Sequence, residues 1–194
     1  KTVVMNTDNL REAVCHDYVC AEYKNHYRNG ENFISADCLP VDCDNDHSED
    51  PKEWVTPADV LEAFPGVSIA IHYSRFNNRE KNGKPARPKF HVLFPIDRMT
   101  DATLYSDMKK LVNSIFPYFD TKALDAARFF FGTQEPNVEL YPGRMNLTEF
   151  LNDDEFDAGL PGGHEKDAVI PEGSRNAVMC RFAGIVIKKY GDSE

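Results

Sequence analysis

The sequence lacks several features that would assign it to a class at once. Its 194 residues contain no run of about 18 apolar residues and no charged-then-apolar leader, which argues against a membrane partner and a secretory signal and predicts a cytoplasmic protein. The glycine-rich patterns of dinucleotide-binding and ATP-binding loops are also absent. The five cysteines show no paired C-x-x-C spacing, so the sequence supports neither a disulfide framework nor a structural zinc site.

Positive charge is scarce as well. The chain has 32 acidic and 22 basic residues and a formal net charge of -10, which argues against a surface coated in positive potential for nucleic acid but leaves room for a local site. The hydrophobic content of 41% is enough to bury a core. Because the chain opens on Lys1 and stops just after a helical pattern, we expect it to be a piece of a longer protein.

The pattern of apolar and turn-forming residues predicts a mixed α+β fold. Helices are expected as one or two segments within 8–28, from Pro57 at the first helical position to 64, from the Asp101 cap to just before Pro117, and after Asn176. Strands are expected after Pro40 and over 67–73, 90–94, 129–131 and 138–141. The strands 67–73 and 90–94 are predicted to pair as a hairpin with a long loop.

The sharpest local feature is Val41-Asp42-Cys43-Asp44, where an apolar strand ends in two acids. Alternate residues of a strand point to one face, so Asp42 and Asp44 can share a hard cation such as Mg²⁺. An isolated Asp-x-Asp is also what a solvated strand end looks like. The buried lead-in favours the cation, because adjacent acids at the end of a buried strand need a counter-ion.

A second feature is Lys89-Phe90-His91, which puts a cation and an imidazole on one face at the start of an apolar strand. The preceding loop is a basic island in an acidic protein, with Arg75, Arg79, Lys81, Lys84 and Arg87 against Glu80. Such a cluster suits phosphate binding. The alternative is a solvated hairpin loop in which His91 is an ordinary hydrogen-bonded residue.

A third feature is Phe119-Asp120, another acid after an apolar lead-in, with Arg128 eight residues on. Taken alone, Asp120 reads as a helix cap, and Asp125 with Arg128 reads as a surface ion pair of little energetic weight.

Taken in order, these motifs resemble the three-motif catalytic signature of the archaeo-eukaryotic primase superfamily. They are similar in particular to the primase-polymerase domains of phages, plasmids and other mobile elements. The residues that carry the resemblance are Asp42 and Asp44, then Lys89 and His91, then Phe119-Asp120 with Arg128 and Phe131-Gly132-Thr133. The chain departs from the family pattern at Lys89, where a small hydroxyl residue is usual, and at Gln134, where a basic tail is usual.

A further likeness concerns the end of the chain. The segment Ile170-Pro171-Glu172-Gly173-Ser174-Arg175-Asn176 resembles the opening of the small helical region that often follows such primase domains. The resemblance therefore implies a catalytic domain over 1–151, an acidic linker over 152–168 and the start of a helical carboxy-terminal region over 169–194.

The resemblance implies an RRM-like antiparallel sheet with flanking helices and an amino-terminal α/β unit, with the active site on an exposed sheet face. Asp42, Asp44 and Asp120 would be the catalytic residues and would hold two Mg²⁺ or Mn²⁺ ions. The nucleotide-binding residues would be His91, Lys89, Arg87 and Arg128.

The implied function is a DNA primase or polymerase, a metal-dependent nucleotidyltransferase that makes or extends primers during replication of a mobile element. Its implied partners are a single-stranded DNA template, NTP or dNTP substrates, and a fused or separate helicase. Two alternatives stay open. One is a catalytically inactive nucleic-acid-binding or replication-scaffold module, and the other is an RRM-like replication nuclease, which would need paired histidines and a tyrosine nucleophile.

Overall fold

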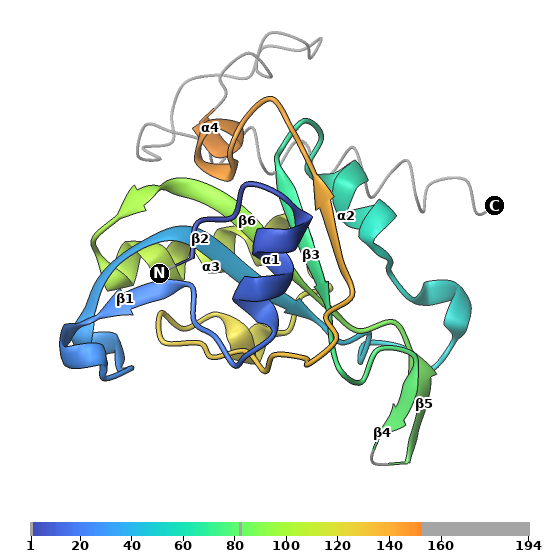
Figure 1. The fold of residues 1–194 in the computed structure, drawn as a ribbon. Helices are drawn as coiled ribbons and strands as arrows, with labels where there is room; N and C mark the ends of the chain where they lie inside the picture. Colours follow the sequence, from blue (N-terminus) through green and yellow to red (C-terminus); the bar gives the residue numbers. More distant parts are fainter. Residues whose placement is uncertain (1, 82, 153–194) are drawn as a thin grey trace, which may run out of the picture.

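One antiparallel sheet with helices on both faces organises the chain (Figure 1). The computed structural model describes residues 2–81 and 83–152. The strand order is β1-β2-β6-β3-β7 with every neighbouring pair antiparallel, while β4 and β5 form a separate two-stranded ribbon. The strands are β1 Ala21–Tyr23, β2 Phe33–Cys43, β3 Ile69–Tyr73, β4 Arg79–Lys81, β5 Lys84–Arg87, β6 Phe90–Met99 and β7 Val138–Tyr141. The α-helices are α1 Thr7–Val14, α2 Pro57–Ala63, α3 Ala102–Ile115 and α4 Leu147–Asn152.

The predicted α+β class and the predicted long-looped hairpin are both confirmed. Strand β3 pairs with β6, and the β4–β5 ribbon protrudes from the connection between them (Figure 1). Apart from the β4–β5 ribbon and the short 3₁₀ turns, the elements from β2 to β7 follow in the order β2, α2, β3, β6, α3, β7, which is the β-α-β-β-α-β order of a split βαβ unit. Strands β2 and β3 run in the same direction on either side of β6, with β1 at one edge and β7 at the other.

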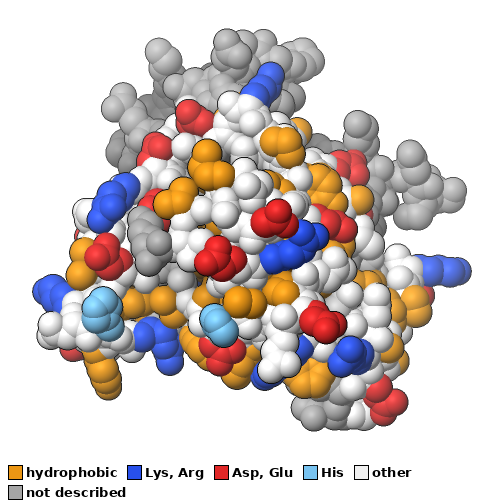
Figure 2. All heavy atoms as spheres, viewed as in Figure 1, with side chains coloured by type: hydrophobic (Ala, Val, Ile, Leu, Met, Phe, Trp, Pro, Cys, Tyr) orange, Lys and Arg blue, Asp and Glu red, His pale blue; other side chains and the backbone are white. Residues whose placement is uncertain are grey.

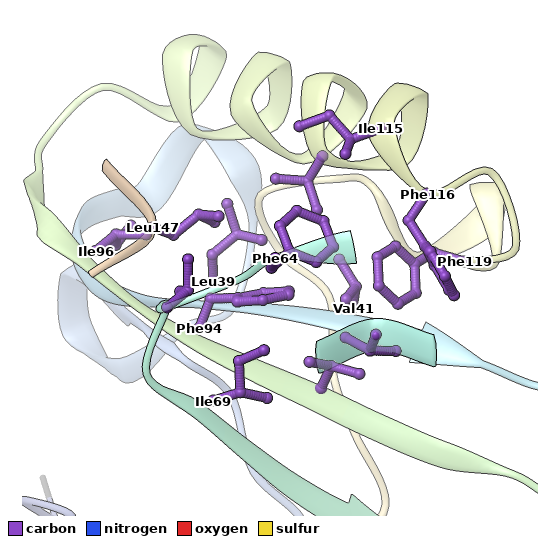
Figure 3. Packing of buried hydrophobic residues seen from close by; sticks show 14 of the residues in the cluster. Leu39, Val41, Phe64, Ile69, Phe94, Ile96, Ile115, Phe116, Phe119 and Leu147 are labelled. Atoms are coloured by element: carbon purple, nitrogen blue, oxygen red, sulfur yellow. The ribbon is translucent and has the colours of Figure 1, made fainter. Parts of the chain in front are cut away.

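The main core lies between one sheet face and helices α2, α3 and α4 (Figure 3). Alternation along β2 sends Leu39, Val41 and Cys43 to this face, where they are fully buried. Phe64, at the end of α2, packs against Phe94 of β6 with ring centroids 4.9 Å apart. Large aromatic side chains therefore fill the space between the sheet and the helices.

The opposite sheet face carries a smaller apolar cluster under α1. Leu10 and Val14 of the helix pack with Ala70 and Leu93 of the central strands β3 and β6 and with Val138 of the edge strand β7. The same face also carries polar side chains from β2, β3 and β6, and these form the candidate site described below.

The prediction of helical structure within residues 8–28 is wrong for the second half of that range. The helix ends at Val14, and Tyr18 instead exchanges both backbone hydrogen bonds with Phe130, at 2.9 and 3.0 Å. Residues Ala21–Tyr23 then form β1 against β2. Pairing between segments distant in sequence outweighs the helical spacing of the apolar residues, which is a local signal.

Two strand predictions also change. Strand β2 begins at Phe33 rather than after Pro40. A proline can lie within this strand because β1 pairs only with residues 33–36, so that no backbone hydrogen bond to β1 is needed at Pro40. Of the expected strand 129–131, only Phe130 is bridged to another segment. The expected amino-terminal α/β unit is not a separate layer, since β1 is the edge strand of the same sheet.

The predicted linker over 152–168 and helical region over 169–194, including the motif from Ile170 to Asn176, lie outside the described residues, apart from Asn152 at the end of α4. Within residues 2–81 and 83–152, none of the helices has the length and hydrophobicity needed to cross a membrane.

Truncation of Phe64 should measure how much this aromatic packing contributes to the stability of the fold. Phe64→Ala removes a ring that is 0% exposed, so we expect the free energy of unfolding in urea to fall by about 3–5 kcal/mol. Leu104→Ala on α3 is the control, because Leu104 is 60% exposed and its truncation should change the free energy by less than about 0.5 kcal/mol. Equal effects of the two substitutions would contradict this account of the core.

Candidate functional site

The register of the three central strands brings an acid and two histidines into one row. Asp42 of β2 is paired with His91 of β6, and His91 is paired with His72 of β3. Directly paired residues point to the same face, so all three side chains lie on the face that carries α1. The Nε2 atom of His91 lies 3.6 Å from Oδ1 of Asp42, and the two imidazole centroids are 5.1 Å apart.

Two segments distant in sequence cover this row. The bridge between Tyr18 and Phe130 holds them together, and Phe130 packs on His91 with a centroid distance of 4.8 Å. At Gly132 a Cβ atom would lie 2.2 Å from the carbonyl oxygen of His16, so only glycine allows the two backbones to approach this closely. The row is therefore buried, whereas the family resemblance implied an exposed sheet face.

A tyrosine hydroxyl links the two histidines. The Tyr18 hydroxyl lies 3.1 Å from Nδ1 of both His72 and His91, and Nε2 of His72 lies 3.1 Å from the Thr133 hydroxyl. Burial lowers the pKa of His72 to about 4, and burial together with the neighbouring His72 and Arg128 lowers that of His91 to about 3. Both rings are therefore neutral at pH 7.

Contacts among three atoms fix the relation between the two rings. The Nδ1 atoms of His72 and His91 lie 3.3 Å apart, and both face the Tyr18 hydroxyl. Two hydrogens cannot face each other at that distance and the hydroxyl can donate to only one ring, so one Nδ1 carries a hydrogen and the other accepts. The two imidazoles are therefore in opposite tautomers. The carboxylate of Asp42 faces Nε2 of His91 and favours a hydrogen there. We therefore assign His91 as the Nε2–H form, and His72 as the Nδ1–H form whose Nε2 accepts from Thr133.

Burying the Asp42 carboxyl in this position is energetically unfavourable. Its Oδ2 accepts a hydrogen bond from Arg128 at 3.2 Å, while its buried Oδ1 has no hydrogen-bond partner. Burial, Asp44 and Asp120 raise the pKa of Asp42 to about 7 against the opposing effect of Arg128. A buried carboxylate that retains an unpaired oxygen beside two further acids is a place where an added cation would lower the energy.

The other two predicted acids lie around the end of β2. Asp44 is paired with Lys89 at 3.0 Å, and its side chain is 32% exposed. The backbone N–H of Asp120 donates to the carbonyl oxygen of Asp42 at 2.7 Å, and the Asp120 carboxylate accepts from the backbone of Lys122. The structure therefore brings Asp42, Asp44, Lys89, His91, Asp120 and Arg128 into one neighbourhood.

These residues have the donor type that a divalent cation requires. Carboxylate oxygens are the ligands that Mg²⁺ and Mn²⁺ prefer, and the unpaired Oδ1 of Asp42 is one such oxygen. In the described part of the chain, however, no three His, Cys, Asp or Glu side chains already converge as a set of metal ligands. Arg128 and Lys89 instead neutralise Asp42 and Asp44 directly.

The loop that presents Arg128 is held by three side-chain donors. Lys109 donates to the carbonyl oxygen of Asp125 at 2.9 Å, the Tyr23 hydroxyl to that of Ala126 at 2.8 Å, and Arg28 to that of Ala127 at 2.6 Å. These donors come from α3, from β1 and from the segment after β1. Because successive carbonyls are fixed, the position of Arg128 is set by the fold rather than by its own ion pair alone.

Arg87 is not part of this neighbourhood. It is fully buried, and its guanidinium donates to the carbonyl oxygens of Asn45 and Ser48 and to the carboxylate of Glu49. Its plane lies over the ring of Trp54 at 5.5 Å. Its contacts hold the loop after β2 in place, and nothing in them supports the predicted contact with a nucleotide.

Two members of the cluster were not predicted. His72 could have been found, because alternation in the expected strand 67–73 puts Ala70 and His72 on one face, and pairing with the 90–94 strand brings His72 near His91. Tyr18 left no usable signal, since its position depends on the bridge to Phe130, 112 residues later in the printed sequence.

A cavity of about 670 Å³ lies on the same sheet face, bounded by α1, β1 and β2. Its lining includes Tyr18, Cys20 and Cys38, together with the acids Glu22 and Asp37. None of the three predicted metal ligands lines it. It is therefore a neighbour of the candidate site and not the site itself.

A scan against protein-family models and a search of curated proteins found no match to this chain. Among solved structures, the fold is similar to the AEP domain of the primase-polymerase (PrimPol) of cyanophage S-2L, with a TM-score of 0.42 and 12% sequence identity. The match covers 64% of this chain and spans 60% of the length of that one. It is a distant likeness at the level of the fold.

The assigned tautomers can be observed directly. Long-range ¹H–¹⁵N NMR spectra at pH 7 should show His91 with its hydrogen on Nε2 and His72 with its hydrogen on Nδ1. Tyr18→Phe removes the shared hydroxyl and should shift the ring nitrogens of both histidines, while those of His47, whose ring contacts Tyr118, stay unchanged. Identical tautomers in the two rings, or a doubly protonated ring, would contradict the assignment.

Burial of neutral His72 should also make stability depend on pH. Its pKa is about 4 when folded against an ordinary 6.5, so its contribution is complete above pH 6.5 and is lost as the pH falls towards 4. The loss should be on the order of 3 kcal/mol. Urea unfolding of wild type and His72→Gln from pH 7 to 4 measures it, and the variant should show the smaller acid-induced loss. Equal loss of unfolding free energy with falling pH in wild type and His72→Gln would contradict this account of His72.

Proposed function

We propose that residues 1–151 form the catalytic domain of a metal-dependent nucleotidyltransferase of the primase-polymerase type, with an RRM-like sheet as its framework. The observation that carries the proposal is the environment of Asp42. Its buried carboxylate keeps one unpaired oxygen, burial and two neighbouring acids raise its pKa, and Arg128 and Lys89 lie beside the group. Acids with an unmet need for a cation, flanked by cations suited to phosphate, fit phosphoryl transfer.

In this proposal Asp42, Asp44 and Asp120 hold Mg²⁺ or Mn²⁺. The bound ions would lower the pKa of a 3′-hydroxyl and stabilise the negative charge that develops as pyrophosphate leaves. Asp42 lies in β2 and Asp44 comes directly after the end of that strand, and the backbone hydrogen bond from Asp120 to Asp42 keeps the third acid beside them.

The triphosphate of the incoming nucleotide would be bound by Arg128, Lys89 and His91. A guanidinium offers two parallel donors to phosphate oxygens, and an ammonium offers a point charge. His91 contributes as a neutral donor, because its lowered pKa keeps the ring uncharged. Asp44 and Arg128 are about one-third exposed, at 32% and 30%, so a substrate would enter at this end of the row.

The biological role that accompanies this activity is primer synthesis or extension on a single-stranded DNA template, from NTPs or dNTPs, in replication of a mobile element. A fused or separate helicase would supply the unwound template. These assignments come from the motif resemblance and extend the proposal beyond the site itself.

One observation favours a second candidate, a nucleic-acid-binding module without catalysis. The carboxylates of Asp42 and Asp44 are neutralised by Arg128 and Lys89, so these ion pairs satisfy much of the charge on the acids without any metal. In such a module the acids would serve to hold Arg128 and Lys89 in place.

A replication nuclease gains less support, although the fold does bring two histidines and a tyrosine together. A tyrosine nucleophile must reach a phosphodiester and lose its proton. Tyr18 is instead enclosed by Phe130 and the two imidazoles, and burial raises the pKa of its hydroxyl well above 10.

Incorporation of labelled nucleotides tests the proposal. Wild type is incubated with NTPs or dNTPs, Mg²⁺ or Mn²⁺, and single-stranded template with and without a primer. We expect metal-dependent product that falls at least about 100-fold in Asp42→Asn, because replacing even a residue that only orients metal ligands costs about 10- to 100-fold. Asp44→Asn should act in the same direction.

The matched control is Asp107→Asn, which removes the charge of an exposed acid of α3 that is ion-paired with Lys110 and should leave product formation unchanged. The urea midpoint of each variant verifies folding. Folded wild type that forms no product with either metal and either sugar would overturn the proposal and favour the binding module. Full activity in Asp42→Asn would overturn the assigned catalytic site.

A further inference from the structure

Two phenylalanines lie on the outside of the segment that delivers Arg128. Phe131 is 50% exposed, and Phe129 is partly exposed. Their ring centroids are 4.9 Å apart, with planes inclined at 79°. Phe130 between them points inward and is buried against Tyr18 and His91. Alternation in an extended segment thus puts one aromatic ring inside and two outside.

Each outer ring is covered on one side by an arginine. The guanidinium of Arg75 lies 4.2 Å from the centroid of Phe131, and that of Arg28 lies 5.5 Å from the centroid of Phe129. Both arginines are exposed, and one follows β3 while the other follows β1. Within residues 2–81 and 83–152, neither guanidinium is ion-paired with a carboxylate. Two charges from separate loops therefore converge on one aromatic surface.

This combination matches the chemistry of unpaired nucleotides. Aromatic faces stack on exposed bases, and guanidinium groups contact both the bases and the phosphates. A duplex offers few such faces, because its bases are stacked on each other. Acidic and basic side chains are interspersed on the molecular face that carries α1 (Figure 2), and the net charge is -10, so general electrostatic attraction contributes little. Affinity would depend on stacking.

We propose that Phe129 and Phe131, flanked by Arg28 and Arg75, form a stacking surface for one or two bases of single-stranded nucleic acid. The inference deepens the proposed function and rests on it for the identity of the bound strand as template. Location supports the link, because Arg128 in the same segment contacts Asp42 at 3.2 Å. A base stacked on this surface would lie on the outer side of the segment whose inner side faces the candidate site.

Fluorescence anisotropy with two labelled probes of equal length tests the proposal, using oligothymidine and an abasic oligonucleotide. The two probes have the same phosphates and differ in their bases. We expect wild type to bind oligothymidine more tightly, and Phe131→Ala to weaken that binding by at least about fivefold. Binding of the abasic probe should not change in the variant. Phe129→Ala should act in the same direction as Phe131→Ala.

The matched control is Leu104→Ala, which truncates another exposed apolar side chain, on α3, and should bind both probes like wild type. Unchanged oligothymidine affinity in Phe129→Ala and Phe131→Ala would overturn the stacking surface, as would equal loss for the two probes. Failure of wild type to bind oligothymidine at high-micromolar protein would overturn it as well and would favour a protein partner for this aromatic surface.

The outcome is separable from that of the proposed function. Binding that depends on Phe131 in a protein that incorporates no nucleotide would retain the stacking surface and reject the nucleotidyltransferase. If nucleotide incorporation depends on Asp42 but Phe131→Ala leaves the oligothymidine affinity unchanged, the proposed enzyme is retained and the stacking surface is rejected.

Discussion

The antiparallel register of β2, β6 and β3 is the constraint on which the candidate site depends. It pairs Asp42 with His91 and His91 with His72, and a shift of one residue in any of these strands would turn that strand's member of the row towards the apolar core. The register is fixed from the opposite face, where Leu39, Val41 and Phe94 pack against the helices. The apolar core therefore determines which polar residues meet on the other side of the sheet.

The covering segments explain why this polar row remains ordered although its burial is unfavourable. Asp42 loses hydration and lies near Asp44 and Asp120, and only Arg128 offsets part of that cost. Arg128 is in position because Lys109, Tyr23 and Arg28 hold the preceding carbonyls. A hydrophobic residue at position 42 would avoid the cost, so the presence of a buried acid there is better explained by function than by stability.

Sequence patterns predicted the parts of this arrangement that depend on local order. Asp42 and His91 could be predicted as site residues because each belongs to an apolar strand with clear alternation. Asp120 could be predicted because an apolar stretch leads into it. Tyr18 was not recoverable, since the bridge to Phe130 interrupts what the local spacing marks as helix. The inward position of Arg87 was not predictable for a similar reason. A basic residue in a basic loop gives no sign that it will turn inward and bind backbone carbonyls.

The segment from Arg128 to Phe131 shows how one short stretch can serve two surfaces. Its alternate side chains point in opposite directions, so that Arg128 and Phe130 contact Asp42 and His91 while Phe129 and Phe131 face solvent beside Arg28 and Arg75. The backbone of this stretch is anchored before residue 128 and bridged at Phe130, so one fixed segment holds both sets of side chains. A nucleic-acid strand stacked on the outer rings would thus be held within three peptide bonds of the arginine that contacts Asp42.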